Sequence, residues 1–472
     1  MPRTKITFYG GVDEIGGNKI LVEDKGTRVF LDFGKGFSSR SQFYDWTEKP
    51  RTANGIGDLL ALGIIPDVDG IYREDLLSLA GRTGKQDCFI DAVVLSHAHA
   101  DHADYISFLR EDIPVWMGET ARDIIRSIEA ERNRDLEYEI SNFKRRPLER
   151  GSEVIPREIR TFSTGSKVSI DSILVEPVHV DHSIPGCYGF IISTSDSAIV
   201  YSGDLRMHGN RPDLTHDFLV EASKAKPDLM LCEGTRINES SSGTEKDVYD
   251  ACKDHVEKSG KSFVFADFSY KDVDRLSTFY RVAKSTGREL LISARTARYM
   301  EALSANGKGP NLPSWKDPNV AIYQPRVKSG TYDDDDYDEE DMRFYNGGNV
   351  WNATDVRKKE SNALVALGAS YVNQLIDIRP RGGLYIHSTS EPFNEEGEMD
   401  EERMSHWMER FSLRRVHSHC SGHASGEDLK KIVKAIQPKA LLPIHTEHPE
   451  LFKTFGVEKL VQAAINSSIE VQ

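Results

Sequence analysis

Three histidines and one aspartate fall within six consecutive residues, from His97 to His102. From an extended loop, His97 and His99 can point the same way, while the turn that follows brings Asp101 and His102 to a neighbouring position. Imidazole nitrogens with a carboxylate oxygen suit zinc, and also manganese or iron, better than calcium or magnesium. The spacing therefore predicts a hydrolytic metal centre in which two metal sites can lie side by side.

The elements on either side must position this cluster. Residues 91–96 contain a short, β-branched apolar run, which is the pattern of a buried parallel strand. Residues 101–110 begin a helix pattern, with apolar side chains on one side. We therefore expect the histidines in a strand-to-helix loop, the structural context that a metal-binding motif requires. An accidental or surface histidine tract would not explain that context.

The pattern His-x-His-x-Asp-His after a strand resembles the signature of the metallo-β-lactamase superfamily. Further residues match the pattern of that superfamily in order: His182, Asp204 and His445. The resemblance implies two groups of metal ligands with Asp204 bridging them: His97, His99 and His182 in one, and Asp101, His102 and His445 in the other. Asp32, in Phe30-Leu31-Asp32-Phe33-Gly34, matches the first motif of the superfamily, which supports the site from a strand end.

Later segments resemble the β-CASP group of nucleases, and especially the RNase J-like ribonucleases in their short, archaeal-type form. They are His182-Ser183-Ile184-Pro185, Glu233-Gly234-Thr235 and His419-Cys420-Ser421-Gly422-His423-Ala424-Ser425. The resemblance implies that Glu233, His423 and His445 are the motifs A, B and C of that group. The chain departs from the pattern after Glu233, because Gly234 replaces a serine and Arg236 replaces an asparagine that are common there.

The resemblance implies an α/β fold, an αββα metallo-β-lactamase sandwich with an inserted α/β β-CASP domain. We expect the first part of the sandwich domain at residues 1–243, the insertion at 244–414 and the return segment at 415–472. The residue pattern agrees, because helix and strand patterns alternate again in the insertion, at 245–258, 262–266, 272–285, 289–293 and 383–387. In the family such an insertion makes a cleft that admits a single strand and excludes duplex.

The expected chemistry is hydrolysis of RNA phosphodiester bonds by a hydroxide that two divalent metals activate, most simply Zn²⁺, with Mn²⁺ as the alternative. The expected catalytic residues are Asp101, which is also a metal ligand, His423 and Glu233. His423 would donate to the phosphate or protonate the leaving group. Glu233 would orient His423. The resemblance also implies a substrate-phosphate site, including one for a 5′-monophosphate, at His419, Ser421, Gly422 and His423. For His419, a loop histidine with satisfied hydrogen bonds is the alternative.

Composition limits the class of protein. At 472 residues and 38% hydrophobic content, the chain can form two or three domains with real cores. No apolar stretch reaches the length of a membrane span, and residues 1–5 lead into a strand pattern rather than a signal-peptide core. We therefore expect a cytoplasmic protein without a membrane partner. The five cysteines are scattered, which is typical of reduced thiols.

The net charge of −15 argues against a nucleic-acid partner, because phosphate contacts need lysine and arginine. Part of this acidic excess lies in one tract, residues 333–341, which we expect to be a solvated loop; a partner-binding or strand-excluding loop is the alternative. A local basic channel would be enough for RNA. Its candidates, for each of which a surface salt bridge is the alternative, are Arg206, Arg211, Arg236, Arg379, Arg381, Arg414 and Arg415.

Three functions remain. The first is an RNase J-like 5′-to-3′ exonuclease on single-stranded RNA, with endonuclease activity as a second mode. The second is a hydrolase of a small ester or thioester, which the insertion and motif B disfavour. The third is a non-catalytic RNA-binding scaffold, although no expected ligand is lost here. The oligomeric state stays open, with a homodimer as one alternative, because the resemblance to the short form implies that a C-terminal domain that helps dimerisation in the family is not expected here.

Overall fold

The computed structural model describes residues 3–45, 47–85, 87–131, 136–149, 151–240, 243–305, 312–390 and 395–471. The chain forms two compact units. Unit 1 comprises Met1–Met207, Arg211–Ser241 and Gly422–Gln472, and unit 2 comprises His208–Asn210 and Ser242–Ser421. Unit 2 is thus an insertion in unit 1. The expected return at residue 415 falls inside a strand of unit 2, β20 (Leu413–His417).

Unit 1 contains two seven-stranded sheets. The first has the order β23-β1-β2-β3-β4-β5-β8, with the strands β1 (Lys5–Gly10), β2 (Lys19–Asp24), β3 (Thr27–Leu31), β4 (Ala92–Val94), β5 (Val115–Gly118), β8 (Ile159–Phe162) and β23 (Ser467–Glu470). The second has the order β22-β21-β13-β12-β11-β10-β9, with β9 (Val168–Ile170), β10 (Ile173–Val180), β11 (Cys187–Ser193), β12 (Ala198–Tyr201), β13 (Leu229–Glu233), β21 (Ala440–Ile444) and β22 (Lys459–Leu460). A small separate sheet pairs β6 (Asn142–Lys144) with β7 (Val154–Pro156).

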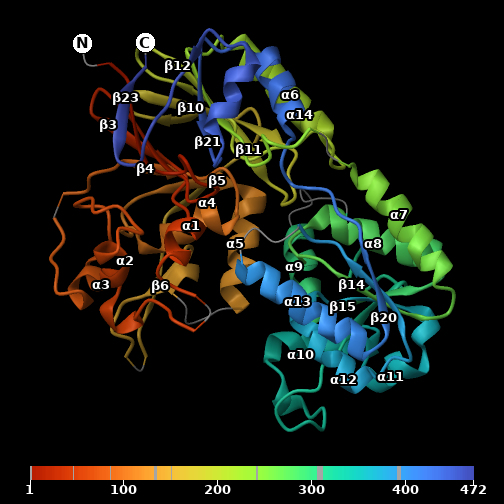
Figure 1. Cartoon of the computed structure of the whole chain (residues 1–472). Coiled ribbons are helices and arrows are strands. Elements are labelled where there is room, and N and C mark those ends of the chain that lie inside the picture. Colours follow the sequence, from red (N-terminus) through yellow and green to blue (C-terminus); the bar gives the residue numbers. More distant parts are fainter. Residues whose placement is uncertain are drawn as a thin grey trace. The chain divides into compact units, whose positions relative to one another are not determined.

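The core of unit 1 lies between the two large sheets. Because successive side chains of a strand point to opposite faces, Leu231 of β13 joins the core between the sheets, while Met230 packs on the other face. That outer face is covered by α6 (Pro212–Lys224) and α14 (Gly426–Ile436), which lie side by side (Figure 1). The other helices of unit 1 are α1 (Phe37–Ser41), α2 (Gly57–Ala61), α3 (Glu74–Leu79), α4 (Ala100–Ala103) and α5 (Glu119–Glu131), the last of which contacts β5 and β8. The expected αββα sandwich is confirmed.

The return segment belongs to both sheets of unit 1. Strand β21 pairs in parallel with β13 in the second sheet, in line with its apolar sequence. The last strand, β23, pairs antiparallel with β1 in the first sheet, from Lys5 opposite Glu470 to Phe8 opposite Ser467. Residues from both ends of the chain are therefore needed to complete this unit.

Unit 2 has one seven-stranded sheet of the order β17-β16-β15-β18-β14-β19-β20, in which all neighbouring strands are parallel. Besides β20, its strands are β14 (Phe263–Asp267), β15 (Glu289–Ser293), β16 (Val320–Tyr323), β17 (Val350–Trp351), β18 (Ala363–Ala366) and β19 (Gly383–His387). Helices pack on both faces: α7 (Glu245–Lys258), α8 (Val273–Ser285), α9 (Ala294–Ser304) and α10 (Glu339–Gly347) on one, and α11 (Ala353–Lys358), α12 (Leu375–Ile378) and α13 (Glu395–Arg410) on the other. This is the expected α/β insertion.

The acidic tract is mostly exposed to solvent, as expected, but it is not a plain loop. Residues 334–336 form a 3₁₀ turn, and α10 begins at Glu339. The buried Asp336 accepts hydrogen bonds from the backbone N–H of Ser329 (2.9 Å) and from its hydroxyl (2.6 Å). Glu339, Glu340 and Asp341 lie in the first turn of α10, where negative charge is stabilised by the helix dipole.

Glu129 in α5 gives the stability of unit 1 a dependence on pH. Its carboxylate accepts a hydrogen bond from the backbone N–H of Ser141, and burial raises the pKa of Glu129 from 4.5 to about 7. Because the pKa is higher in the folded state, its contribution to stability is full below pH 4.5 and is lost as the pH rises through about 7. We expect the free energy of unfolding, measured by urea denaturation, to fall between about pH 5 and 8 in the wild type. In Glu129→Gln it should fall less over the same pH range.

The exposed Glu149 provides a matched control. Glu149→Gln should follow the wild-type pH profile. If the free energy of unfolding depends on pH in the same way in the wild type and in Glu129→Gln, Glu129 is not the source of this pH dependence.

Candidate metal centre

The candidate ligands follow the ends of strands from both sheets of unit 1. His97 and His99 follow β4, and α4 then carries Asp101 and His102. In the second sheet, His182, Asp204 and His445 come shortly after β10, β12 and β21. The predicted helix over 101–110 is shorter than expected, because α4 ends at Ala103 and a 3₁₀ turn follows. The structure brings all these residues together.

One group of ligand atoms consists of three imidazoles and the shared carboxylate of Asp204. His99 Nδ1 lies 3.1 Å from His97 Nε2 and 3.1 Å from His182 Nε2. Asp204 Oδ2 is 3.6 Å from His97 Nε2 and 3.8 Å from His182 Nε2. These nitrogens converge with the carboxylate, the arrangement that a divalent cation needs.

A second group lies on the other side of Asp204 and includes Asp101, His102 and His445. His445 Nε2 is 3.0 Å from Asp101 Oδ2 and 3.7 Å from Asp204 Oδ2. His102 Nε2 is 3.2 Å from Asp204 Oδ2. Asp204 is therefore common to both groups, in the position where the resemblance expects a bridging ligand.

The buried polar atoms test whether metal ions fit here. Among the described residues, His102 Nε2 and Asp204 Oδ1 are buried without a hydrogen-bond partner. A buried polar atom in that state costs free energy, and metal coordination would remove the cost. With imidazole and carboxylate donors, the residues could hold two divalent cations.

The electrostatics favour the ligand forms of most of these groups. Burial lowers the pKa of His97 and of His182 well below 6.5, so both imidazoles are neutral. Burial raises the pKa of the Asp204 carboxyl, but His102 and His445 outweigh burial and hold it well below 3.8. His102 and His445 differ. Burial lowers the pKa of both, but Asp204 and other carboxylates raise that of His102 well above 6.5, and Asp204 and Asp101 raise that of His445 to about 9. Bound cations would displace both protons.

Asp32 orients His102 from the end of β3, as expected from its motif. The buried Asp32 carboxylate accepts hydrogen bonds from Ser96 N–H (2.6 Å), Ser96 Oγ (2.8 Å) and Tyr201 OH (2.5 Å). Asp32 Oδ2 also lies 2.7 Å from His102 Nδ1, which donates to it. This hydrogen bond leaves His102 Nε2 for the ligand group.

Two other ligands are oriented in the same way. The Nδ1–H of His182 donates to the Gly422 carbonyl over 2.6 Å, and Thr235 Oγ1 lies 2.8 Å from His445 Nδ1. A Cβ on Gly422 would stand 2.6 Å from Ser183 Oγ. A side chain at position 422 would therefore disturb the hydrogen bond between His182 and the Gly422 carbonyl. The structure thus gives the Gly422 carbonyl a role beside His182, which the sequence did not predict.

Motifs A and B form a pair beside the ligand groups. His423 Nδ1 lies 3.2 Å from each carboxylate oxygen of Glu233. Glu233 is itself fixed by the backbone N–H of Leu205 (3.0 Å) and of Thr235 (3.1 Å). Burial lowers the pKa of His423, but Glu233 outweighs burial and raises it above 6.5. The raised pKa favours the protonated form of His423, whose Nδ1 lies 4.0 Å from Asp204 Oδ2.

The remaining predicted residues are not members of the two ligand groups. His419 and Ser421 belong to unit 2. Arg206 is fully buried, with its Nε 3.4 Å from Asp181 Oδ1, so the prediction that it lines a basic channel is wrong. Salt bridges with neighbouring carboxylates hold three other channel candidates, Arg211, Arg236 and Arg415.

Sequence reasoning missed the residues that orient the ligands, namely Ser96, Tyr201, Thr235 and Gly422. Ser96 directly precedes His97, and Thr235 lies two residues after Glu233, so proximity in the sequence could have indicated both. Gly422 was predicted as a phosphate-binding residue, but its contact with His182 depends on a residue far away in the chain. Tyr201 had no comparable signal, because its contact with Asp32 is also distant in the sequence.

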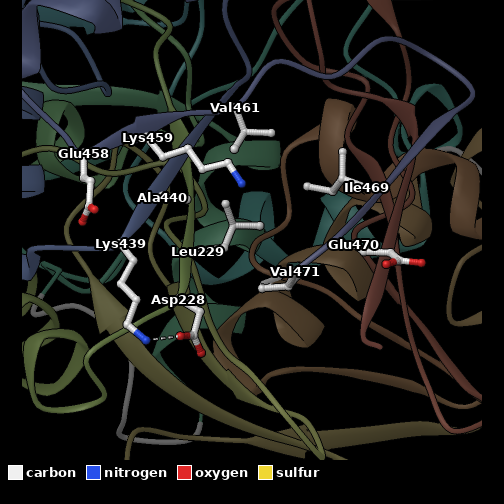
Figure 2. A pocket seen from close by; sticks show the side chains of 10 residues that line it. All are labelled: Asp228, Leu229, Lys439, Ala440, Glu458, Lys459, Val461, Ile469, Glu470 and Val471. Carbon is white, nitrogen blue, oxygen red and sulfur yellow. Dashed lines mark hydrogen bonds and ion pairs between the residues drawn. The ribbon is translucent and has the colours of Figure 1, made fainter. Parts of the chain in front are cut away.

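A pocket of about 420 Å³ opens elsewhere in unit 1 (Figure 2). It is lined by Asp228, Leu229, Lys439, Ala440, Glu458, Lys459, Val461, Ile469, Glu470 and Val471. None of these lining residues is a predicted site residue, and Lys439 Nζ is paired with Asp228 over 2.7 Å. The pocket is therefore separate from the candidate metal centre.

Gly34 provides a test of how the backbone positions the second ligand group. A Cβ at Gly34 would stand 1.8 Å from the carbonyl oxygen of Asp101, so a side chain must displace the Asp101–His102 turn. We expect Gly34→Ala to bind metal about 10-fold or more weakly, as measured by metal titration and elemental analysis. Gly243→Ala is the control, because nothing lies within 4 Å of its added Cβ. Full metal affinity in folded Gly34→Ala would contradict the prediction.

Two family models match this chain. One, described as a beta-lactamase superfamily domain, matches residues 76–256. The other, described as a Zn-dependent metallo-hydrolase RNA specificity domain, matches residues 410–453. Among the described residues, no helix is long and apolar enough to cross a membrane.

The chain is similar to known proteins over nearly its whole length. Ribonuclease J of Pyrococcus abyssi is 23% identical over 94% of this chain and 90% of that protein. Ribonuclease J of Corynebacterium glutamicum is 25% identical over 94% of this chain, but this chain spans about half of that relative (53%). A solved structure of a protein of unknown function from Enterococcus faecalis shares the fold, with a TM-score of 0.76, 23% identity and coverage of 99% of this chain and 100% of that one. The chain thus contains a match to a beta-lactamase superfamily domain and is similar, over nearly its whole length, to ribonuclease J-like metallo-hydrolases of the β-CASP group.

Proposed function

We propose that the chain is a metal-dependent ribonuclease that degrades single-stranded RNA from the 5′ end, with internal cleavage as a second mode. The observation that carries this proposal is the pair of ligand groups that share Asp204, with the Glu233–His423 pair beside them. The RNA specificity model supports RNA as the substrate, because its match contains His423 and His445. The ribonuclease J relatives support the same activity.

Divalent cations held by the two ligand groups would supply a water of low pKa and stabilise negative charge at phosphorus. The chain itself orients the ligands, because Asp32, Gly422 and Thr235 each engage the Nδ1 of one imidazole. Glu233 engages the Nδ1 of His423, and the imidazolium carries its second N–H on Nε2. His423 can then donate its proton to the leaving oxygen of the phosphodiester.

The donor set favours zinc over magnesium or calcium, because imidazole nitrogens outnumber carboxylates in the first group. The family description of a Zn-dependent metallo-hydrolase supports the same metal. Manganese is the alternative. The cytoplasmic location and the choice between a monomer and a homodimer stay predictions.

The first test uses end-labelled single-stranded RNA with a 5′-monophosphate or a 5′-triphosphate. We expect the zinc- or manganese-loaded protein to release mononucleotides, and His182→Asn to reduce this rate by at least about 100-fold. His179→Asn is the matched control, because His179 lies three residues earlier on β10, outside both ligand groups, with its ring stacked on Tyr188. Turnover of small esters alone, or tight RNA binding without cleavage, would overturn the proposal.

The role of His423 has its own test. We expect His423→Ala to lower kcat by about 10²- to 10⁴-fold, the range for loss of a general acid, while zinc content and RNA affinity stay near those of the wild type. Single-turnover cleavage measures the rate, and elemental analysis measures the metal. A parallel loss of metal would show that His423 acts as a ligand instead of a proton donor.

A further inference from the structure

The loop between β1 and β2 lies against the second ligand group. The Gly11 carbonyl accepts a hydrogen bond from the backbone N–H of His445 over 2.8 Å, and the backbone N–H of Asn18 donates to the Asp101 carbonyl over 3.1 Å. The approach is close, because a Cβ on Gly16 would stand 2.7 Å from Asp101 Oδ2. The backbone of one loop therefore holds two of the three ligands that are particular to this group.

The side chain of Asn18 is connected to the third ligand, His102. Asn18 is fully buried just before β2, and its Nδ2 donates to the hydroxyl oxygen of Tyr201 over 3.0 Å. The Tyr201 hydroxyl, at the end of β12, donates to Asp32 Oδ2 over 2.5 Å, and the same oxygen accepts from His102 Nδ1 over 2.7 Å. A chain of three hydrogen bonds thus links Asn18 to His102.

The direction of each hydrogen bond in this chain is fixed by chemistry. A carboxylate only accepts, so Tyr201 must give its single proton to Asp32. Burial, and then Asp32, raise the pKa of Tyr201 well above 10, so the hydroxyl keeps that proton. The Tyr201 oxygen can then only accept from Asn18. The amide NH₂ of Asn18 therefore directs the Tyr201 hydroxyl toward Asp32, whose position in turn orients His102.

The asparagine has a cost for the stability of unit 1. Within the part of the chain that the structure describes, Asn18 Oδ1 is buried without a hydrogen-bond partner, which costs free energy. This oxygen lies against Gly11, where a Cβ would stand 2.2 Å from it. A leucine has nearly the same shape and would avoid that cost. Stability alone therefore does not explain an asparagine at position 18.

We propose that Asn18 is a positioning residue for the second metal site, acting through Tyr201 and Asp32 and not as a ligand. This inference rests on the proposed function, because it assumes the metal centre. The first ligand group depends less on Asn18, because its connection is one hydrogen bond longer: Ser96 Oγ donates to Asp32 and lies 3.0 Å from His97 Nδ1. The two metal sites should therefore differ in their response to a change at Asn18.

The first test measures zinc binding and does not depend on activity. Metal-free full-length protein is titrated with Zn²⁺ in two backgrounds: His182→Asn, which weakens the first ligand group, and His445→Asn, which weakens the second. We expect Asn18→Leu to lower zinc affinity about 10-fold in the His182→Asn background, but by less than about 2-fold in the His445→Asn background. Equal losses in both backgrounds would overturn the inference.

The second test asks whether Asn18 acts through Tyr201. In the His182→Asn background, Asn18→Leu and Tyr201→Phe should each weaken zinc binding, and the double change should weaken it no more than Tyr201→Phe alone. Additive losses would overturn the inference. Tyr72→Phe is the matched control and should leave zinc affinity unchanged, because Tyr72 is also a buried tyrosine of unit 1 but donates to the Pro66 carbonyl over 2.5 Å.

Urea denaturation of the metal-free protein separates positioning from a structural role. The midpoint for Asn18→Leu should not fall below that of the wild type, because leucine lacks the unpartnered Oδ1. A lower midpoint together with weaker zinc binding in both backgrounds would mean that Asn18 stabilises unit 1, and would overturn the inference. If the wild type binds zinc but cleaves no RNA, the proposed function fails, while the zinc titrations still decide the role of Asn18.

Discussion

The buried carboxylate of Asp204 is the constraint on which the arrangement of unit 1 depends. It is 1% exposed and lies between two groups of histidines. A buried charge is costly unless it is paired, so the loops that follow β4, β10, β12 and β21 must all end around it. The sandwich makes this arrangement feasible, because strands of both sheets end near the same point. Asp32 and Glu233 then fix the imidazoles around that carboxylate.

Much of the fold could be predicted from local sequence. The pattern over 245–258 matches α7, whose capping box from Thr244 to Asp247 marks its start. The strands at 289–293 and 383–387 have the predicted bounds. Strand β23 had no such signal, because its pairing with β1 depends on residues at the opposite end of the chain. The ligand candidates could be named because each follows a strand end in a recognisable motif. Their assignment as ligands stays a prediction.

Buried arginines explain why the distribution of charge was hard to predict. Arg73, Arg206 and Arg275 are fully buried, and each lies beside a carboxylate. Sequence patterns cannot distinguish such a residue from a surface cation, because both stand in polar segments. The guanidinium can satisfy several loop carbonyls at once. In this chain, some arginines therefore support loops from inside a unit, while exposed ones such as Arg211 pair with neighbouring acids.

The second ligand group joins Asp101 to His445, which are 344 positions apart. The ribosome must therefore synthesise the whole of unit 2 before this group can form. The same holds for the hydrogen bond that the backbone N–H of His445 donates to the Gly11 carbonyl over 2.8 Å. A nascent or prematurely terminated chain that lacks His445 has the His97–His102 cluster but not the complete centre. Synthesis must therefore proceed past unit 2, as far as His445, before the second ligand group can be complete.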